Sequence, residues 1–322
     1  MQPLDKSFRH LPRQEKLKQL VSHGWLSEET QSLLENNALI DEDVANSLIE
    51  NVITQGALPV GLLPQITVED KDYVVPMMVE EPSVVAAASY GAKLVGKTGG
   101  FHVISSERLM IGQVVFDHVE DTAALKQQLL DLAPQIKQIA DEAYPSIIER
   151  GGGYRKMDVD TFESAQFVSL KVYVDTQDAM GANMLNTILE GIAAFLSQEL
   201  PDSEILMSIL SNHATASVVK VTGEIDVADL TKGDKDGEVV AERMARASEL
   251  TQVDIHRAAT HNKGVMNGIH AVVLATGNDT RGTEASAHAY ASKDGQYKGL
   301  ATWHYDTERQ RLVGTIEVPM TL

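Results

Sequence analysis

The segment over residues 107–212 constrains the fold more than any other, because its apolar residues change regularly between strand and helix spacing. The pattern predicts, in order, a strand at 110–116, a helix at 122–143, strands at 156–161 and 167–174, a helix at 180–200 and a strand at 205–210. This β-α-β-β-α-β succession is typical of a ferredoxin-like domain. We therefore predict an α+β protein in which a ferredoxin-like domain over 107–212 is inserted into a large mixed domain made of residues 1–106 and 213–322.

The predicted large domain begins with short amphipathic helices over residues 1–64, the third of which starts at Asp41 and carries an apolar stripe as far as Ile53. The glycines and proline over 56–61 indicate a turn or loop. Further along, the spacing predicts a strand at 73–79, an Ala-rich helix at 84–95, a strand from Val218, a helix at 237–250, and closing strands at 299–304 and 312–318.

Charge and residue usage exclude several classes of function. The 322 residues include 46 acidic and 27 basic side chains, for a formal net charge of −19, which disfavours binding to nucleic acids or anionic lipids. We expect a cytoplasmic protein, because no apolar run is long enough to span a membrane and residues 1–15 lack the apolar core of a signal peptide. The cysteine count of zero excludes disulfides, thiolate metal sites and cysteine nucleophiles. The ten histidines show no HExxH spacing, so no metal is expected.

One motif suggests a phosphoryl-transfer enzyme. The stretch Gly91–Thr98 matches the phosphate-binding consensus GxxxxGK[ST] in every letter. The match falls at the end of the Ala-rich helix predicted over 84–95, where Gly96 has the character of a helix cap rather than of a loop. A phosphate-binding loop there is the alternative to the function argued below. The GxGxxG fingerprint of Rossmann folds is absent.

Two short stretches concentrate polar chemistry beside apolar sequence. Residues 257–268 hold Arg, His, Lys and two Asn, and the run Ala271–Ala275 that follows is apolar. A capped helix boundary with a solvated lysine would explain this stretch, but polar groups beside buried sequence also need partners or a ligand. In Thr276–Arg281 the simplest explanation is a turn in which Asn and Asp cap the next helix.

Five ordered motifs together resemble class II 3-hydroxy-3-methylglutaryl-coenzyme A (HMG-CoA) reductases. They are Glu50–Ile53, Val79–Ser89, Asp178–Asn183, Arg257–Gly268 and Ala275–Asp279, and they extend over nearly the whole chain. The resemblance implies an oxidoreductase of the mevalonate pathway of isoprenoid biosynthesis, which reduces HMG-CoA to mevalonate and coenzyme A. Two hydrides are transferred in succession, through a bound hemithioacetal and an aldehyde, and the same site works in both directions.

The resemblance also implies three catalytic residues. Lys263 would be the cation that stabilises negative charge on the carbonyl oxygen. Glu81 would be the proton donor, kept protonated by apolar neighbours that raise its pKa. Asp279 would hydrogen-bond both groups, so that the three side chains titrate as one cluster.

The remaining implied site residues bind substrate and cofactor. Arg257, Ser83 and Asn267 would hold the acyl part of the substrate, and Arg9 would contact coenzyme A. Asp178, Met180, Gly181 and Asn183 would receive the cofactor's pyrophosphate at a helix N-terminus, and Asn212 would also face the cofactor. Tyr144 lies seven residues before the triple glycine Gly151–Gly153, where NAD-preferring members of the family have an acid, so NADPH is expected over NADH.

The resemblance further implies a homodimer with its active site between the subunits. Family members continue past the equivalent of Leu322 into a C-terminal flap that carries a catalytic histidine, and no histidine follows His304 here. A dimerising fragment that binds ligand without turning over is therefore a further alternative.

Overall fold

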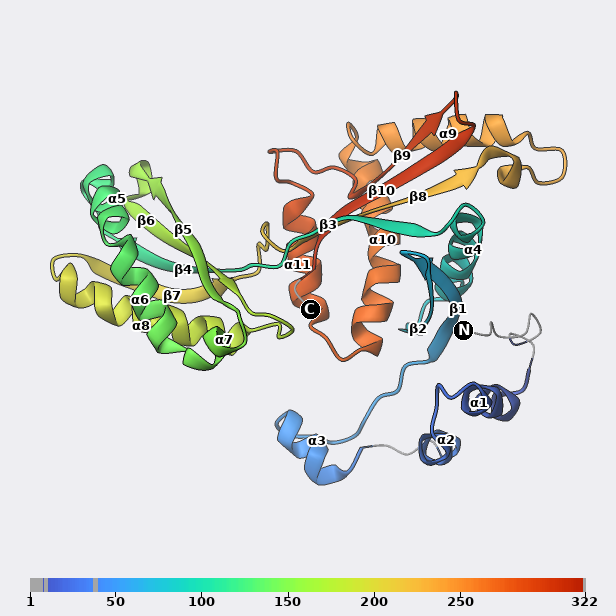
Figure 1. Cartoon of the computed structure of the whole chain (residues 1–322), viewed down its shortest axis with the longest axis horizontal. Helices are drawn as coiled ribbons and strands as arrows, with labels where there is room; N and C mark the ends of the chain where they lie inside the picture. Colours follow the sequence, from blue (N-terminus) through green and yellow to red (C-terminus); the bar gives the residue numbers. More distant parts are fainter. Residues whose placement is uncertain (1–7, 9–10, 37–39, 321–322) are drawn as a thin grey trace. The chain divides into compact units, whose positions relative to one another are not determined.

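The computed structural model describes residue 8 and residues 11–36 and 40–320 of the chain. The chain divides into two compact units, residues 1–100 (unit 1) and residues 101–322 (unit 2), and each is described by itself. Helices and two β-sheets together give the α+β class predicted from the sequence (Figure 1). The division into 1–106, 107–212 and 213–322 remains a prediction.

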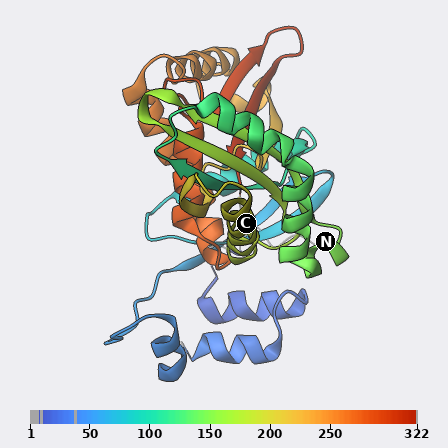
Figure 2. The same ribbon diagram turned by 90° about the vertical axis from the view of Figure 1, so that its left-hand side faces the viewer.

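Unit 1 contains four helices and a β-hairpin among its described residues. Helices α1 and α2 lie side by side (Figure 2), and the side chain of Ser27 caps α2. The elements are α1 (Arg13–Ser22), α2 (Glu28–Glu35), α3 (Glu42–Leu48), β1 (Val60–Val68), β2 (Lys71–Met78) and α4 (Val84–Gly96).

The third helix is shorter than predicted. It ends at Leu48, and Ile49 has extended backbone angles. The apolar stripe expected to continue through Ile53 is not buried by its own chain, because Leu48, Ile49 and Ile53 are 67%, 62% and 95% exposed. The apolar stripe from which this helix was predicted therefore continues beyond the last helical residue.

Strand β1 was not predicted, and it begins inside the expected loop over 56–61. Its residues lack a strand alternation, and Pro64 interrupts the pairing with β2, where the register shifts between Leu63 and Ile66. Strand β3 (Phe101–Ser106) in unit 2 was missed as well. The local sequence of both strands gives little indication of a strand, because pairing with distant segments, rather than a local pattern, defines them.

The phosphate-loop match is helical. Gly91 and Gly96 both lie within α4, Lys97 is its C-cap, and Thr98 follows in a turn. The amide groups of a phosphate loop must be directed at the ligand, whereas helical amides are directed at carbonyl groups of the preceding turn. The alternative based on Gly91–Thr98 is therefore wrong.

Lys97→Ala is expected to leave cofactor-dependent activity unchanged, and the free energy of unfolding within about 0.5 kcal/mol, because exposed surface substitutions have small effects. Activity assays and urea unfolding would check this, with Lys93→Ala on the same helix as the matched control. Abolished nucleotide binding in Lys97→Ala alone would contradict the helical assignment.

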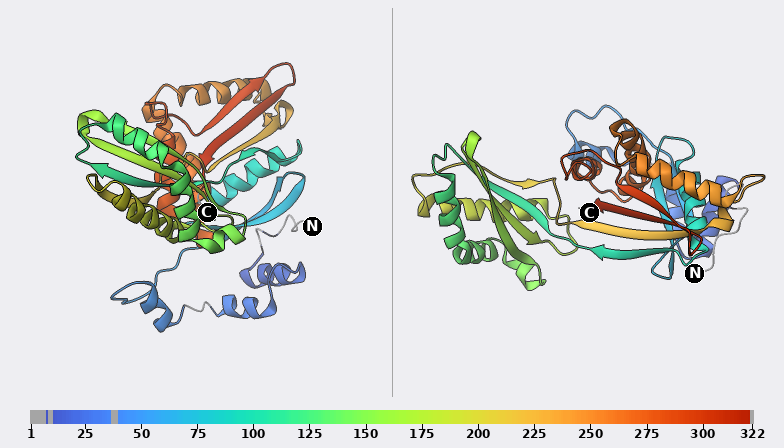
Figure 3. Two further views of the ribbon diagram at one scale, coloured as in Figure 1. Left: turned by 60° about the vertical axis from the view of Figure 1, so that its left-hand side comes forward. Right: turned by 90° about the horizontal axis from the view of Figure 1, so that it is seen from above.

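The sheet of unit 2 that begins with β3 lies beside the elements that hold the polar stretches of the sequence. Its strands are antiparallel neighbours in the order β3-β8-β10-β9, and α9 lies along β9 (Figure 3). The elements after β3 are β8 (Val218–Asp226), α9 (Gly237–Leu250), α10 (Ile255–Ala275), α11 (Thr280–Tyr290), β9 (Ala301–Asp306) and β10 (Arg311–Pro319).

The smaller sheet of unit 2 follows the predicted β-α-β-β-α-β succession, with strand order β5-β6-β4-β7. The helix predicted over 122–143 is divided at Leu132, because Pro134 opens a second helix. The elements are β4 (Met110–Asp117), α5 (Thr122–Asp131), α6 (Ala133–Ala143), α7 (Pro145–Glu149), β5 (Gly153–Phe162), β6 (Phe167–Asp175), α8 (Ala182–Glu199) and β7 (Glu204–Ser211).

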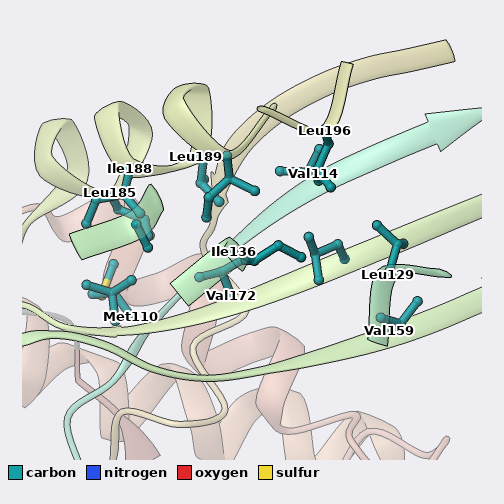
Figure 4. Close-up of a cluster of buried hydrophobic side chains, with 14 of the residues drawn as sticks. Met110, Val114, Leu129, Ile136, Val159, Val172, Leu185, Ile188, Leu189 and Leu196 are labelled. Atoms are coloured by element: carbon teal, nitrogen blue, oxygen red, sulfur yellow. The ribbon is translucent and has the colours of Figure 1, made fainter. Parts of the chain in front are cut away.

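One hydrophobic core joins this sheet to its helices. Leu185, Ile188 and Leu189 of α8 are fully buried and face Val172 of β6 and Ile136 of α6 (Figure 4). Burying each such side chain contributes about 1.5–3 kcal/mol of transfer free energy. The core therefore fixes α8, and the loop that precedes it, against strand β6.

No helix in the described ranges combines the length and apolar character of a membrane span.

Candidate functional site

The polar stretch at 257–268 lies in the interior of α10, so its interpretation as a helix boundary is wrong. The helix begins after Asp254, whose side chain accepts a hydrogen bond from the backbone amide of His256, and it continues to Ala275. Lys263 and Asn267 are four residues apart and therefore share one face of the helix. Lys263 is exposed, and Asn267 is half-buried. The resemblance assigned these two residues to one site, and the helix brings them together.

Another face of α10 is fixed to the segment before β9. Asn262, which is fully buried, donates a hydrogen bond to the carbonyl of Lys298 at 2.8 Å and accepts one from the amide of Leu300 at 2.8 Å. The ring of His261 lies 3.1 Å from the carbonyl of Ala301, and burial lowers the pKa of His261 below its usual value. These contacts fix the orientation of α10 about its own axis, and they thereby fix the direction in which Lys263 projects.

Asp279 is the N-cap of α11, as its position in the turn suggested. Its Oδ1 accepts hydrogen bonds from the amides of Arg281 and Gly282, both at 3.1 Å. A Cβ at Gly282 would lie 2.6 Å from Oδ2 of Asp279 and 3.3 Å from Oδ1 of Asn212. The absence of a side chain at Gly282 thus lets a predicted cofactor residue, Asn212, approach the predicted catalytic acid.

Of the predicted pyrophosphate residues, Asp178, Met180 and Gly181 lie in the loop before α8, and Asn183 lies in the first turn of the helix. Gly181 is the N-cap with φ of 82°, and no side chain caps the helix. The first turn of α8 carries no acidic residue, so its N-terminal amides offer partial positive charge. Asp178 and Asn183 are exposed, and Met180 is half-buried. The four residues lie together at one helix N-terminus, where an anion would be stabilised.

Glu81 and Ser83 lie in unit 1, immediately before α4. The sequence predicted that apolar neighbours bury Glu81, but the residue is exposed, so its own chain does not desolvate the carboxyl group. Ser83 is the N-cap of α4 with φ of 73° and makes no capping hydrogen bond. A non-glycine residue in this region is strained, which is frequent at functional sites.

Tyr144 lies between α6 and α7, where it packs half-buried against the core of the smaller sheet. Arg9 lies outside the described residues. Arg257, on α10, is half-buried and lies six residues before Lys263.

No group of three or more His, Asp or Glu side chains suited to a metal ion occurs in the ranges that the structure describes.

Sequence reasoning missed an ion pair between Arg155 and Asp175. Nη2 of Arg155 lies 2.8 Å from Oδ2 of Asp175. The two residues are 20 positions apart, so no short-range spacing signals the pair. They meet because β5 pairs with β6 with Gly153 opposite Asp175.

Comparison with known proteins decides the family. The sequence profile described as hydroxymethylglutaryl-coenzyme A reductase matches residues 12–322. The chain belongs to the HMG-CoA reductase family.

Relatives of known structure and sequence agree with this membership. A class II HMG-CoA reductase from Streptococcus pneumoniae, solved with NADPH bound in open conformations, is 43% identical and superposes with a TM-score of 0.93, over 98% of this chain and 86% of that one. The HMG-CoA reductase of Archaeoglobus fulgidus is 38% identical over 98% of this chain and 71% of its own length. A probable HMG-CoA reductase of Borreliella burgdorferi is 35% identical over the same shares.

Membership of the HMG-CoA reductase family makes the chain an oxidoreductase that uses a nicotinamide cofactor. It supports the interpretation of the five motifs and gives no support to the phosphoryl-transfer alternative.

Proposed function

We propose that this protein reduces HMG-CoA to mevalonate and coenzyme A with two equivalents of NADPH. The observation that carries the proposal is the exposed Lys263 on the same face of α10 as Asn267, at the motif positions of an HMG-CoA reductase. An assay of NADPH oxidation with HMG-CoA as the substrate tests it. No oxidation above the rate without HMG-CoA would contradict it.

Lys263 supplies the positive charge that the reaction needs. Each reduction step places negative charge on the oxygen of a carbonyl group, and a preorganised ammonium group stabilises that charge by about 3–4 kcal/mol. Asn267, one helical turn further along, holds the acyl part of the substrate beside the lysine. Arg257 binds the free carboxylate of the substrate by charge-assisted hydrogen bonds, and Ser83 contributes its hydroxyl group.

Glu81 donates the proton that converts the oxyanion into an alcohol. Its exposure in the single chain means that the apolar surroundings needed to keep it protonated come from bound substrate and from a second subunit. We therefore propose a homodimer with the site between subunits. Asp279 is held by its capping hydrogen bonds, which leave its other carboxylate oxygen for hydrogen bonds with Lys263 and Glu81.

The loop before α8 fits a dinucleotide. The uncapped N-terminus of α8 suits a pyrophosphate, and Asn212 lies beside Gly282, close to Asp279. When bound there, the nicotinamide cofactor supplies hydride to the carbonyl carbon. The residues of this chain orient the dinucleotide and exclude water, and Asn212 connects its site to the catalytic acid.

We propose a preference for NADPH over NADH. Tyr144 carries no charge that would repel the 2′-phosphate. Of the basic residues near the triple glycine, Arg155 has its guanidinium on Asp175 and on backbone carbonyls, and the ammonium of Lys156 lies 4.4 Å from the ring centroid of Tyr173. Arg150 is exposed, and its Nε donates to the carbonyl of Ser146, so we assign the contact with the phosphate to its guanidinium.

Tyr144→Asp is expected to shift the preference towards NADH by raising the KM for NADPH, because a carboxylate repels the 2′-phosphate and accepts a hydrogen bond from a ribose hydroxyl. The ratio of kcat/KM for the two cofactors measures the effect, with Tyr144→Phe as the control. A higher kcat/KM for NADH in the unmodified protein would contradict the proposed role of Tyr144, while the reductase assignment would stand.

A further inference from the structure

Two loops at the same end of the smaller sheet lie on either side of one ion pair. The first is the triple glycine Gly151–Gly153, which leads into β5, and the second is the loop over 175–181, which leads from β6 into α8. The proposed function places the pyrophosphate at the second loop and the 2′-phosphate at Arg150, which directly precedes the first loop. A dinucleotide can be held in one conformation only if the two loops keep a fixed distance, because misplacement by about 1 Å can cost a hundredfold in rate.

Arg155 holds the first loop by donating hydrogen bonds to backbone carbonyl groups of that loop. Nη2 of its guanidinium donates to the carbonyl of Gly151 at 2.6 Å, and Nη1 donates to the carbonyl of Gly152 at 3.1 Å. The amide of Gly152 donates in turn to the carbonyl of Ile147, within α7. The guanidinium therefore supplies the hydrogen bonds that these loop carbonyls would otherwise accept from water.

The same guanidinium reaches the second loop through Asp175. Nη2 of Arg155 lies 2.8 Å from Oδ2 of Asp175, whose other oxygen accepts hydrogen bonds from the backbone amide and the side-chain amide of Gln177, at 2.9 and 3.0 Å. Gln177 has a φ of 54°, in the left-handed region. The carboxylate thus stabilises a backbone conformation that a glutamine residue rarely adopts.

From Asp175 the constraint continues to the N-terminus of α8. Thr176, which is 1% exposed, donates its hydroxyl hydrogen bond to the carbonyl of Ala179 at 2.7 Å. A Cβ at Gly181 would collide with the Thr176 side chain, so the loop closes tightly on the helix cap. Arg155, Asp175 and Thr176 therefore form a continuous connection from the triple glycine to the first amides of α8.

We propose that the Arg155–Asp175 pair is a positioning device for the dinucleotide, which sets the distance between the triple-glycine loop and the pyrophosphate-binding end of α8. This inference rests on the proposed function. The pair acts through the loops rather than by touching the cofactor, because its hydrogen-bonding groups face backbone carbonyls and Gln177. Such a pair contributes little to folding, because its side chains are 39% and 22% exposed and ion pairs near the surface are weak.

Arg155→Ala is expected to raise the Kd for NADPH about tenfold, the factor typical of losing hydrogen bonds from a charged group. The KM for HMG-CoA and the Tm should change little. Arg155→Lys should resemble Arg155→Ala, because one ammonium cannot reproduce the fork that reaches two carbonyls and a carboxylate. Asp175→Asn should weaken NADPH binding less, because it keeps the acceptor for Gln177.

The control is Arg309→Ala, which removes another exposed ion pair of unit 2, between Arg309 and Glu224 at 2.7 Å. Calorimetric titration of each variant with NADPH gives Kd without reference to turnover. A raised Kd for Arg155→Ala with an unchanged Kd for Arg309→Ala supports the proposal. An unchanged Kd for both Arg155 variants, or an equal rise in the control, overturns it. An unmodified protein that binds NADPH but does not reduce HMG-CoA refutes the proposed reaction and leaves this comparison of Kd values decisive.

Discussion

Lys263→Ala is expected to lower kcat by about 100-fold or more, because it removes the preorganised cation at the carbonyl oxygen and the remaining hydrogen bonds cannot replace its charge. The Kd for NADPH should change little, because the proposed dinucleotide site lies at α8 rather than on α10. Steady-state kinetics with HMG-CoA, together with titration of NADPH, would separate the two effects.

Two controls accompany this substitution. Lys126→Ala on α5 removes a helical lysine outside the motifs and should leave kcat unchanged. Lys263→Arg keeps the charge in a larger, planar group and should recover only part of the activity. Turnover near that of the unmodified protein in Lys263→Ala would contradict the assignment of the oxyanion cation.

Glu81→Gln is expected to lower kcat by about 100-fold, the lower end of what general acids contribute. The amide keeps the size of the side chain but cannot donate a proton to the oxyanion. Glu80→Gln is a close control, because Glu80 is also exposed and precedes the same helix. The pH dependence of kcat should lose its basic limb in Glu81→Gln alone, and an equal loss of activity in both variants would contradict the role of Glu81.

The sequence predicted most of the smaller sheet, because the apolar residues of β6 alternate with polar ones and its helices repeat apolar residues at helical spacing. In β6, Val168, Leu170 and Val172 are fully buried on one face, as their alternation predicts. Prediction from the sequence failed at β1 and at the end of α3. Strand β1 contains Pro64 within a bulged register, and the stripe of α3 continues beyond the last helical residue, Leu48.

The candidate site could be predicted from the sequence where a single element carries its residues. Lys263 and Asn267 share a face of α10, so their sequence spacing already places them together. Asp279 caps α11, as its place in the turn suggested, and the capping bonds use one carboxylate oxygen and leave the other for the proposed catalytic role.

Features that depend on contacts between residues distant in the chain could not be predicted from the sequence. The Arg155–Asp175 pair arises from strand register, and the exposure of Glu81 differs from the burial that its apolar sequence neighbours predicted.

The stoichiometry of the reaction tests the central claim most directly. Purified protein would be incubated with HMG-CoA and excess NADPH until no further change occurs, and NADPH consumed, coenzyme A released and mevalonate formed would be measured together. This ratio does not depend on how fast the reaction runs. The account predicts two NADPH oxidised for each coenzyme A released and each mevalonate formed, because reducing a thioester to an alcohol requires two hydrides. Consumption of one NADPH per coenzyme A, or the absence of mevalonate, would contradict it.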